Sequence, residues 1–177
     1  MNKLTSFILA LTSLVLLSSC GGSSGGGDDF FGAGRTAIQV TPNRIDVGDR
    51  MRVRVWLEDA IEDGVALKIR FPDALDYVPD TGALITHRDD RTVPRDPDVD
   101  VKINGVNYLV WYITVNQLDE NRDGLIEFQL VGRDRVREGK VAVDADVIDP
   151  LVDIEDQFDP EDPEFQVEAS DWIEVID

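Results

Sequence analysis

The chain has 177 residues, and its 36 acidic side chains outnumber its 17 basic ones, which gives a formal net charge of −19 at pH 7. A charge this negative excludes nucleic acid as a partner, because binding to a phosphate backbone requires a basic face. With one cysteine and one histidine, the chain cannot form an internal disulfide, and it offers little for Ser/His/Asp catalysis.

The first predicted element, in residues 1–19, is a secretory signal peptide. Lys3 is the only charged residue before Asp28, and an almost wholly apolar run extends from Phe7 to Leu17. A basic start, a short apolar core and small residues before a cleavage point are typical of a signal peptide, whereas the run is too short for a lasting transmembrane helix.

The sequence Leu-Ser-Ser-Cys at 17–20 resembles a bacterial lipobox. The resemblance implies that Cys20 becomes the mature N-terminus and carries a diacylglycerol thioether and usually an acylated amine. Each buried methylene contributes about 0.8 kcal/mol, so two or three acyl chains would hold the protein durably on a membrane. Gly21 follows, not the Asp that retains lipoproteins at an inner membrane. We therefore expect a lipid-anchored protein of the cell envelope, at the outer membrane if the cell has two.

Residues 20–35 are predicted to form a flexible tether that begins at the lipidated cysteine. Gly and Ser dominate this segment, and a segment this polar cannot bury enough apolar surface to offset the entropy of ordering it. The remaining residues, 36–177, have the length of one domain and can bury one sizeable core.

From Thr36 onward, apolar and polar residues alternate with a period of two, which indicates strands with one buried face. The segment 50–57 shows this best, since Met, Val, Val and Leu alternate with three Arg and a Trp. Further strands are predicted at 36–40, 65–71, 99–103, 108–115, 125–131, 140–148 and 165–176.

Turn residues separate these segments, and Asn104-Gly105 is a good signal for a tight hairpin. A phase shift near Ser170 and Asp171 predicts a β-bulge in the last strand. No apolar stripe of helical spacing lasts three turns. The sequence therefore predicts an all-β fold, a single antiparallel Ig-like β-sandwich of about 8–9 strands that follows the signal peptide and linker.

Two short motifs carry a further resemblance. Thr41-Pro42 is followed by Val47-Gly48-Asp49 before the strand at 50–57, and Phe71-Pro72 is followed by Leu75-Asp76-Tyr77-Val78. This pattern resembles the Ig-like and cohesin-like modules of bacterial surface proteins. The resemblance implies the sandwich fold and an adhesive or scaffolding role, and it implies no particular ligand.

Four residues form a candidate calcium site: Asp119, Asn121, Asp123 and Glu127. Oxygen ligands at alternate positions before a Gly are what a calcium loop needs. The segment departs from an EF-hand, because position twelve is Leu130 and the flanks resemble strands. The alternative is a solvated turn in which Asp and Asn serve the backbone. Calcium is the one cofactor that the sequence suggests.

The segment 149–164 is acidic and interrupted by prolines, which is typical of a solvated extended loop. A second interpretation is a divalent-cation site. Its ligands would be Asp153, Glu155, Asp156, Asp159 and Asp162.

Arg50, Arg52 and Arg54 lie on one face of a predicted strand, and Lys68 and Arg70 could lie beside them. These bases could bind an anionic polysaccharide or an acidic protein. The alternative is cross-strand pairing with the many acids of the chain.

Trp111 and Tyr112 could provide stacking platforms for sugars. Because neighbouring residues of a strand face opposite ways, one of the two must be exposed or covered by a second layer. The alternative for both rings is core packing.

We therefore expect a non-enzymatic lipoprotein that binds an envelope protein or a polysaccharide. A second hypothesis is a structural or assembly factor that pairs an edge strand with a partner chain. A more distant third is a carbohydrate-active enzyme.

Overall fold

The computed structural model describes residues 33–86 and 91–177. They belong to one compact unit, Phe31–Asp177. The predicted signal peptide, Cys20, most of the tether and His87 lie outside the described residues. Within the described part, no helix is long and apolar enough to cross a membrane.

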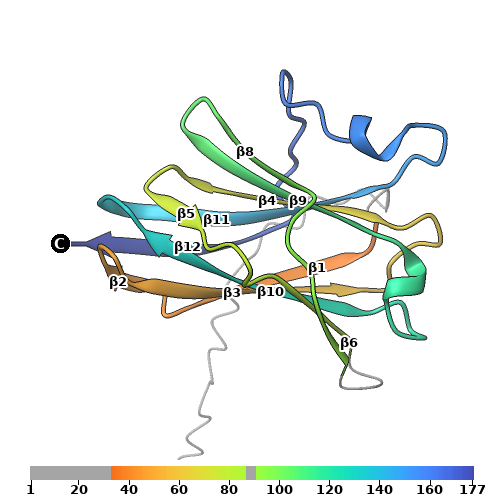
Figure 1. Cartoon of the computed structure of the whole chain (residues 1–177), viewed down its shortest axis with the longest axis horizontal. Helices are drawn as coiled ribbons and strands as arrows, with labels where there is room; N and C mark the ends of the chain where they lie inside the picture. Colours follow the sequence, from red (N-terminus) through yellow and green to blue (C-terminus); the bar gives the residue numbers. More distant parts are fainter. Residues whose placement is uncertain (1–32, 87–90) are drawn as a thin grey trace, which may run out of the picture. The chain divides into compact units, whose positions relative to one another are not determined.

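The described residues form two β-sheets that pack face to face, so the all-β sandwich is confirmed (Figure 1). Sheet A has the order β1-β3-β10-β6-β7, and β5 also pairs with β10. Its strands are β1 (Arg35–Thr41), β3 (Arg50–Glu58), β5 (Leu75–Tyr77), β6 (Ala83–Thr86), β7 (Arg91–Pro94) and β10 (Gly124–Gly132).

Sheet B has the order β2-β12-β11-β4-β9-β8. Its strands are β2 (Arg44–Asp46), β4 (Val65–Pro72), β8 (Val99–Ile103), β9 (Val106–Ile113), β11 (Val136–Val147) and β12 (Ala169–Ile176). Two short 3-10 turns, η1 (Val115–Gln117) and η2 (Ile154–Asp156), lie between strands.

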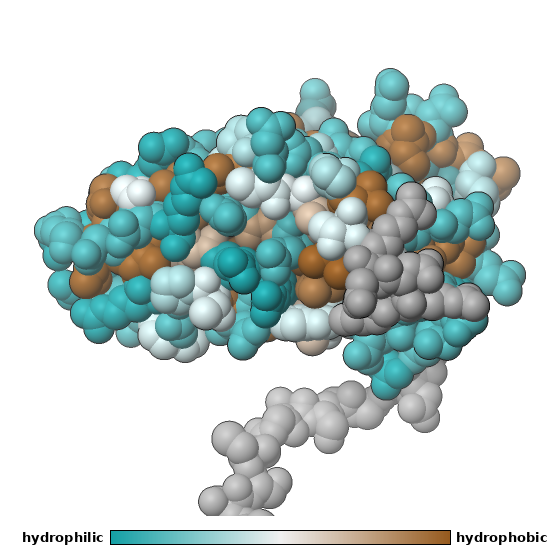
Figure 2. Space-filling model, turned by 60° about the horizontal axis from the view of Figure 1, so that its bottom comes forward, coloured by the Kyte–Doolittle hydropathy of each residue, from teal (hydrophilic) through white to brown (hydrophobic). Residues whose placement is uncertain are grey.

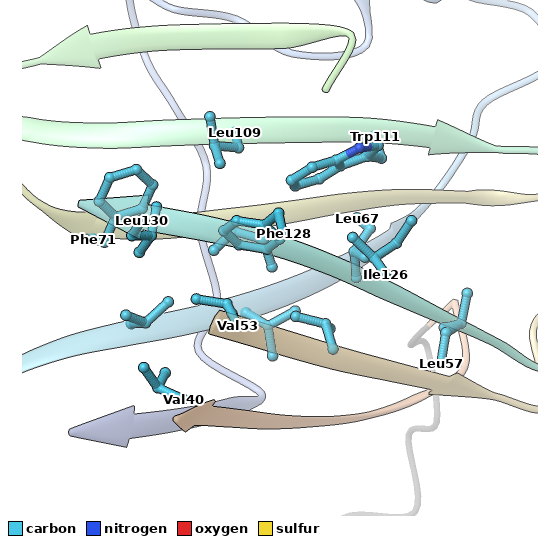
Figure 3. Packing of buried hydrophobic residues seen from close by; sticks show 14 of the residues in the cluster. Val40, Val53, Leu57, Leu67, Phe71, Leu109, Trp111, Ile126, Phe128 and Leu130 are labelled. Carbon is cyan, nitrogen blue, oxygen red and sulfur yellow. The ribbon is translucent and has the colours of Figure 1, made fainter. Parts of the chain in front are cut away.

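The main core fills the space between the two sheets (Figure 3). Alternate residues of β3 point into it, and Trp111 of β9 packs against Phe128 of β10 with ring centroids 5.2 Å apart. Both aromatic side chains are fully buried. This contact joins the two sheets across the sandwich.

The structure corrects the expected sandwich in three respects. The described residues form twelve strands and not 8–9, because β2, β5, β6 and β7 were not predicted. One pairing, β12 with β2, is parallel. The irregularity in the last pairing lies in β11, between Val136 and Gly139, and not in β12 near Ser170. Three- and four-residue strands show too few alternations to be recognised in a sequence.

The hairpin between β8 and β9 forms as predicted. Asn104 and Gly105 have φ angles of 51° and 79°, and two successive positive φ values characterise the type I′ turn that suits the strand twist. This turn fixes the register in which Ile103 pairs with Val106.

A second hydrophobic cluster lies on the outer face of sheet B. Residues 149–168, which we call the strap, connect β11 to β12 along this face (Figure 1). Phe158 of the strap is buried against Tyr108, with ring centroids 5.8 Å apart, and Phe165 lies 6.1 Å from the same ring. The strap is therefore a packed second layer.

Candidate functional site

The outer face of sheet A carries an open hollow of about 570 Å³. Among the residues that the structure describes, three arginines line it and no acidic residue does. Figure 2 views the molecule from the side of β3 and β10, and hydrophilic side chains dominate this surface. The full lining is Gln39, Thr41, Pro42, Arg50, Met51, Arg52, Arg54 and Gln129. We call Arg50, Arg52, Arg54 and this hollow the arginine face.

The alternation of β3 places the three arginines. Met51, Val53, Val55 and Leu57 are buried in the core, so Arg50, Arg52 and Arg54 must project from the opposite side of the strand. Antiparallel pairing then brings polar residues beside them. Gln39 of β1 lies opposite Arg54, and Gln129 of β10 lies opposite Arg52.

Glu127 of β10 is the acidic partner of the arginines of β3. Its carboxylate lies 2.7 Å from Nε of Arg54 and 3.6 Å from Nε of Arg52. Arg50 donates to the neutral amide oxygen of Gln129 at 3.3 Å. One carboxylate thus orients two guanidinium groups, and the row keeps an excess of positive charge. The cross-strand pairing that the sequence suggested is present, and ligand binding by these arginines stays a prediction.

Lys68 and Arg70 do not extend the arginine face, which corrects that expectation. Both residues are on β4, in sheet B, and they face the strap. The guanidinium carbon of Arg70 lies 4.5 Å from the ring centroid of Phe165, a cation–π contact. β3 and β4 are close together in the sequence, and the sequence alone did not show that they belong to different sheets.

Lys68 is a buried ion that ties the strap to sheet B. Its ammonium group lies 2.7 Å from Oδ2 of Asp144, bonds the carboxylate of Asp146, and donates to the carbonyl of Glu164 at 2.8 Å. Burial lowers the pKa of Lys68, but the bonds to the two aspartates outweigh it and leave that pKa raised. The ammonium group therefore stays charged throughout the neutral range.

Trp111 and Tyr112 are both buried, at 0% and 6% exposure, so neither ring offers a face to a sugar. Trp111 points into the main core and donates its indole N–H to the carbonyl of Arg95 at 3.0 Å. Tyr112 points the other way, under the strap, where burial and then Asp98 raise its pKa. The rings face opposite sides, as predicted, and a second layer covers the outer one.

The residues of the candidate calcium site are divided between two places. Oδ1 of Asp119 accepts hydrogen bonds from the backbone N–H groups of Asn121 and Asp123, both at 2.9 Å. Oδ1 of Asp123 accepts from the N–H of Asp59 at 2.9 Å. Glu127 belongs to the arginine face. Calcium binding by this turn stays a prediction.

The acidic residues of the strap are also only partly gathered. Asp156, Asp159 and Asp162 line a hollow of about 250 Å³ beside Lys68, while Asp153 and Glu155 do not line it. Among the described residues, no group of three or more His, Cys, Asp or Glu side chains is placed to hold a metal ion. Lys68 lines the same hollow and supplies a positive charge beside these carboxylates.

Sequence reasoning missed the neutral part of the arginine face. Gln39, Thr41, Pro42 and Gln129 join it from β1, β10 and the segment after β1. Only the strand register brings them together, and register cannot be read from one strand at a time.

No protein-family model and no curated protein matches this chain. The N-terminal domain of a Streptococcus gordonii adhesin is similar at 14% identity over 63% of this chain and 29% of that chain, with a TM-score of 0.45. A non-cellulosomal cohesin from Archaeoglobus fulgidus is similar at 11% identity over 81% of this chain and 92% of that chain, with a TM-score of 0.41. The major pilin subunit of Bacillus cereus is similar at 7% identity over 80% of this chain and 39% of that chain, with a TM-score of 0.42. This chain thus spans less than a third of the adhesin. Similarities this distant carry no argument about function.

Proposed function

We propose that this chain is a non-catalytic binding module of the cell envelope, held on a membrane through a lipidated Cys20, whose arginine face binds an acidic segment of a protein. One observation carries the proposal. Three arginines line a hollow with no acidic residue among its described lining residues, in a chain whose net charge is −19. A local excess of positive charge on so acidic a protein attracts carboxylates. Each guanidinium group can pair with a carboxylate through two parallel hydrogen bonds.

The geometry of the arginine face favours an extended peptide as the ligand. Side chains two residues apart on one strand lie about 6.7 Å apart, and the same spacing separates alternate side chains of an extended peptide. Arg50, Arg52 and Arg54 can therefore meet three alternate carboxylates. The hollow has no aromatic residue in its lining, so it lacks a surface on which a sugar ring could stack.

Binding of a fluorescent decaglutamate peptide to the full chain tests the proposal. The variant Arg50→Gln/Arg52→Gln/Arg54→Gln should bind the peptide at least tenfold more weakly than the wild type. The matched control is Arg133→Gln/Arg135→Gln/Arg137→Gln, which removes three arginines of the same spacing elsewhere on the surface. The control should bind like the wild type. Equal losses in both variants would show attraction to overall charge and would contradict the proposal.

The lipid anchor is tested separately by Cys20→Ser. We expect this variant to leave the membrane fraction of the producing cells, and the wild-type chain to stay in it. A variant that stays in the membrane fraction would contradict lipid anchoring through Cys20.

A further inference from the structure

The tip of the strap is an acidic and apolar projection. Its residues 149–156, which we call the acidic knob, include Asp149, Asp153, Glu155 and Asp156 and no base. Between these acids lie three aliphatic side chains that are exposed to solvent. Leu151 is 93% exposed, and Val152 and Ile154 are also exposed. Single exposed aliphatic residues are ordinary, whereas a cluster of them on a projection is typical of a contact surface.

The acidic knob is held in one conformation by Gln157. The side-chain amide of Gln157 donates to the carbonyls of Asp149 and Val152, at 2.8 and 2.9 Å, and accepts from the N–H of Asp149 at 3.1 Å. Oδ1 of Asp149 accepts from the N–H of Leu151 at 2.8 Å. The exposed side chains are thus presented on a pre-organised loop, which lowers the entropy that a partner must overcome on binding.

The acidic knob and the arginine face lie on opposite sides of the sandwich. Phe158, which follows the knob, packs on the outer face of sheet B against Tyr108. The hollow is on the outer face of sheet A. The two outer faces point away from each other because the inner faces meet in the core (Figure 1). A knob therefore cannot fill the hollow of its own chain.

We infer that the acidic knob of one copy of this chain docks in the arginine face of a second copy. This inference rests on the proposed function and names its partner segment. The knob offers four carboxylates and the exposed side chain of Leu151, and the hollow offers three arginines and Pro42. The contact joins two different surfaces, so a dimer keeps one knob and one hollow free, and further copies can add head to tail.

The net charge gives this association a distinctive dependence on salt. Two copies of charge −19 repel each other at low ionic strength, where charges act over about 30 Å at 0.01 M salt. Near 0.15 M salt the range falls to about 8 Å, which screens the repulsion more than the close ion pairs. At 1 M salt the ion pairs weaken too. Association should therefore be strongest at intermediate salt.

Sedimentation of the compact unit 31–177, which contains both sheets and both hydrophobic clusters, tests the inference. Leu151→Ser removes the centre of the knob, and Arg50→Ser/Arg52→Ser removes charge from the hollow. Each altered site is exposed, and thermal melts check that both variants fold. Arg133→Ser/Arg135→Ser is the charge-matched control.

We expect the wild type and the control to form dimers and longer chains near 0.15 M salt, and each of the two site variants alone to stay monomeric. A mixture of the two site variants should form dimers and nothing longer, because one intact knob meets one intact hollow. A monomeric wild type, or a mixture that stays monomeric, would overturn the inference. If decaglutamate still binds in that case, the proposed function stands without it, and if decaglutamate fails to bind as well, both fail.

Discussion

The two outer faces of the sandwich differ in what lies over them. On sheet A, Arg50, Arg52 and Arg54 of β3 project into an open hollow. On sheet B, the outward residues of β9 are Tyr108, Val110 and Tyr112, and the strap covers them. A sheet face of arginines and amides can stay in water, whereas a face of aromatic and aliphatic residues needs a second layer.

This difference is present in the sequence as two kinds of strand. The segment 50–57 alternates strictly, which is typical of a strand with one solvent-exposed face. The segment 108–113 is continuously apolar, which is typical of a strand buried on both sides. A strand without alternation therefore indicates that some other part of the chain must cover its second face.

The largest expected effect is that of Lys68→Met, which would weaken the covered face. Lys68 is 4% exposed and Asp144 is 2% exposed, so the substitution leaves a buried carboxylate without its cation. Such a change costs about 3–5 kcal/mol. Urea unfolding would measure it.

The double variant Lys68→Met/Asp144→Leu is the control for that loss. Replacing both ions by apolar side chains should recover most of the stability, because no buried charge remains unpaired. If Lys68→Met alone costs less than about 1 kcal/mol, the ion pair does not hold the strap in place.

Phe158→Ala should have the next largest effect. The ring is 6% exposed and is the main apolar anchor of the strap, so its loss should cost about 3 kcal/mol. Proteolysis within the strap should accelerate, while decaglutamate should still bind to sheet A. Leu151→Ala, on the exposed tip, should change stability by less than about 0.5 kcal/mol. Unchanged proteolysis of Phe158→Ala would show that the strap does not depend on this cluster.

Arg54→Ala should have only a small effect on stability, below about 1 kcal/mol. The Arg54 and Glu127 side chains are 39% and 26% exposed, and ion pairs in contact with water contribute little. The same substitution should weaken binding of decaglutamate several-fold in a fluorescence titration. A loss of stability as large as that of Lys68→Met would mean that the arginine row is structural.

Much of the sandwich follows from the sequence, because the eight longer strands each show several alternations or a long apolar run. The short strands and the strap do not. Phe158 could have indicated that the strap packs on the sandwich, because an aromatic side chain in an acidic, proline-rich segment is more stable when buried. Phe165 was predicted to begin the last strand, and it instead packs as part of the strap.

The candidate site could be predicted only in its charged part. The alternation of β3 puts three arginines on one face, and that much is visible in the sequence. Whether Lys68 and Arg70 join them depends on which sheet each strand enters. The burial of Trp111 and Tyr112 likewise depends on layers that segments distant in the chain provide.

The central claim is that the arginine face, and not the covered face, meets acidic ligands. The side-chain Nε–H resonances of the arginines test it most directly, in NMR spectra recorded as decaglutamate is added to the compact unit 31–177. We expect the resonances of Arg50, Arg52 and Arg54 to shift in a saturable way, and that of Arg70, stacked on Phe165, to stay in place. A shift at Arg70 with none at Arg50, Arg52 and Arg54 would contradict the claim.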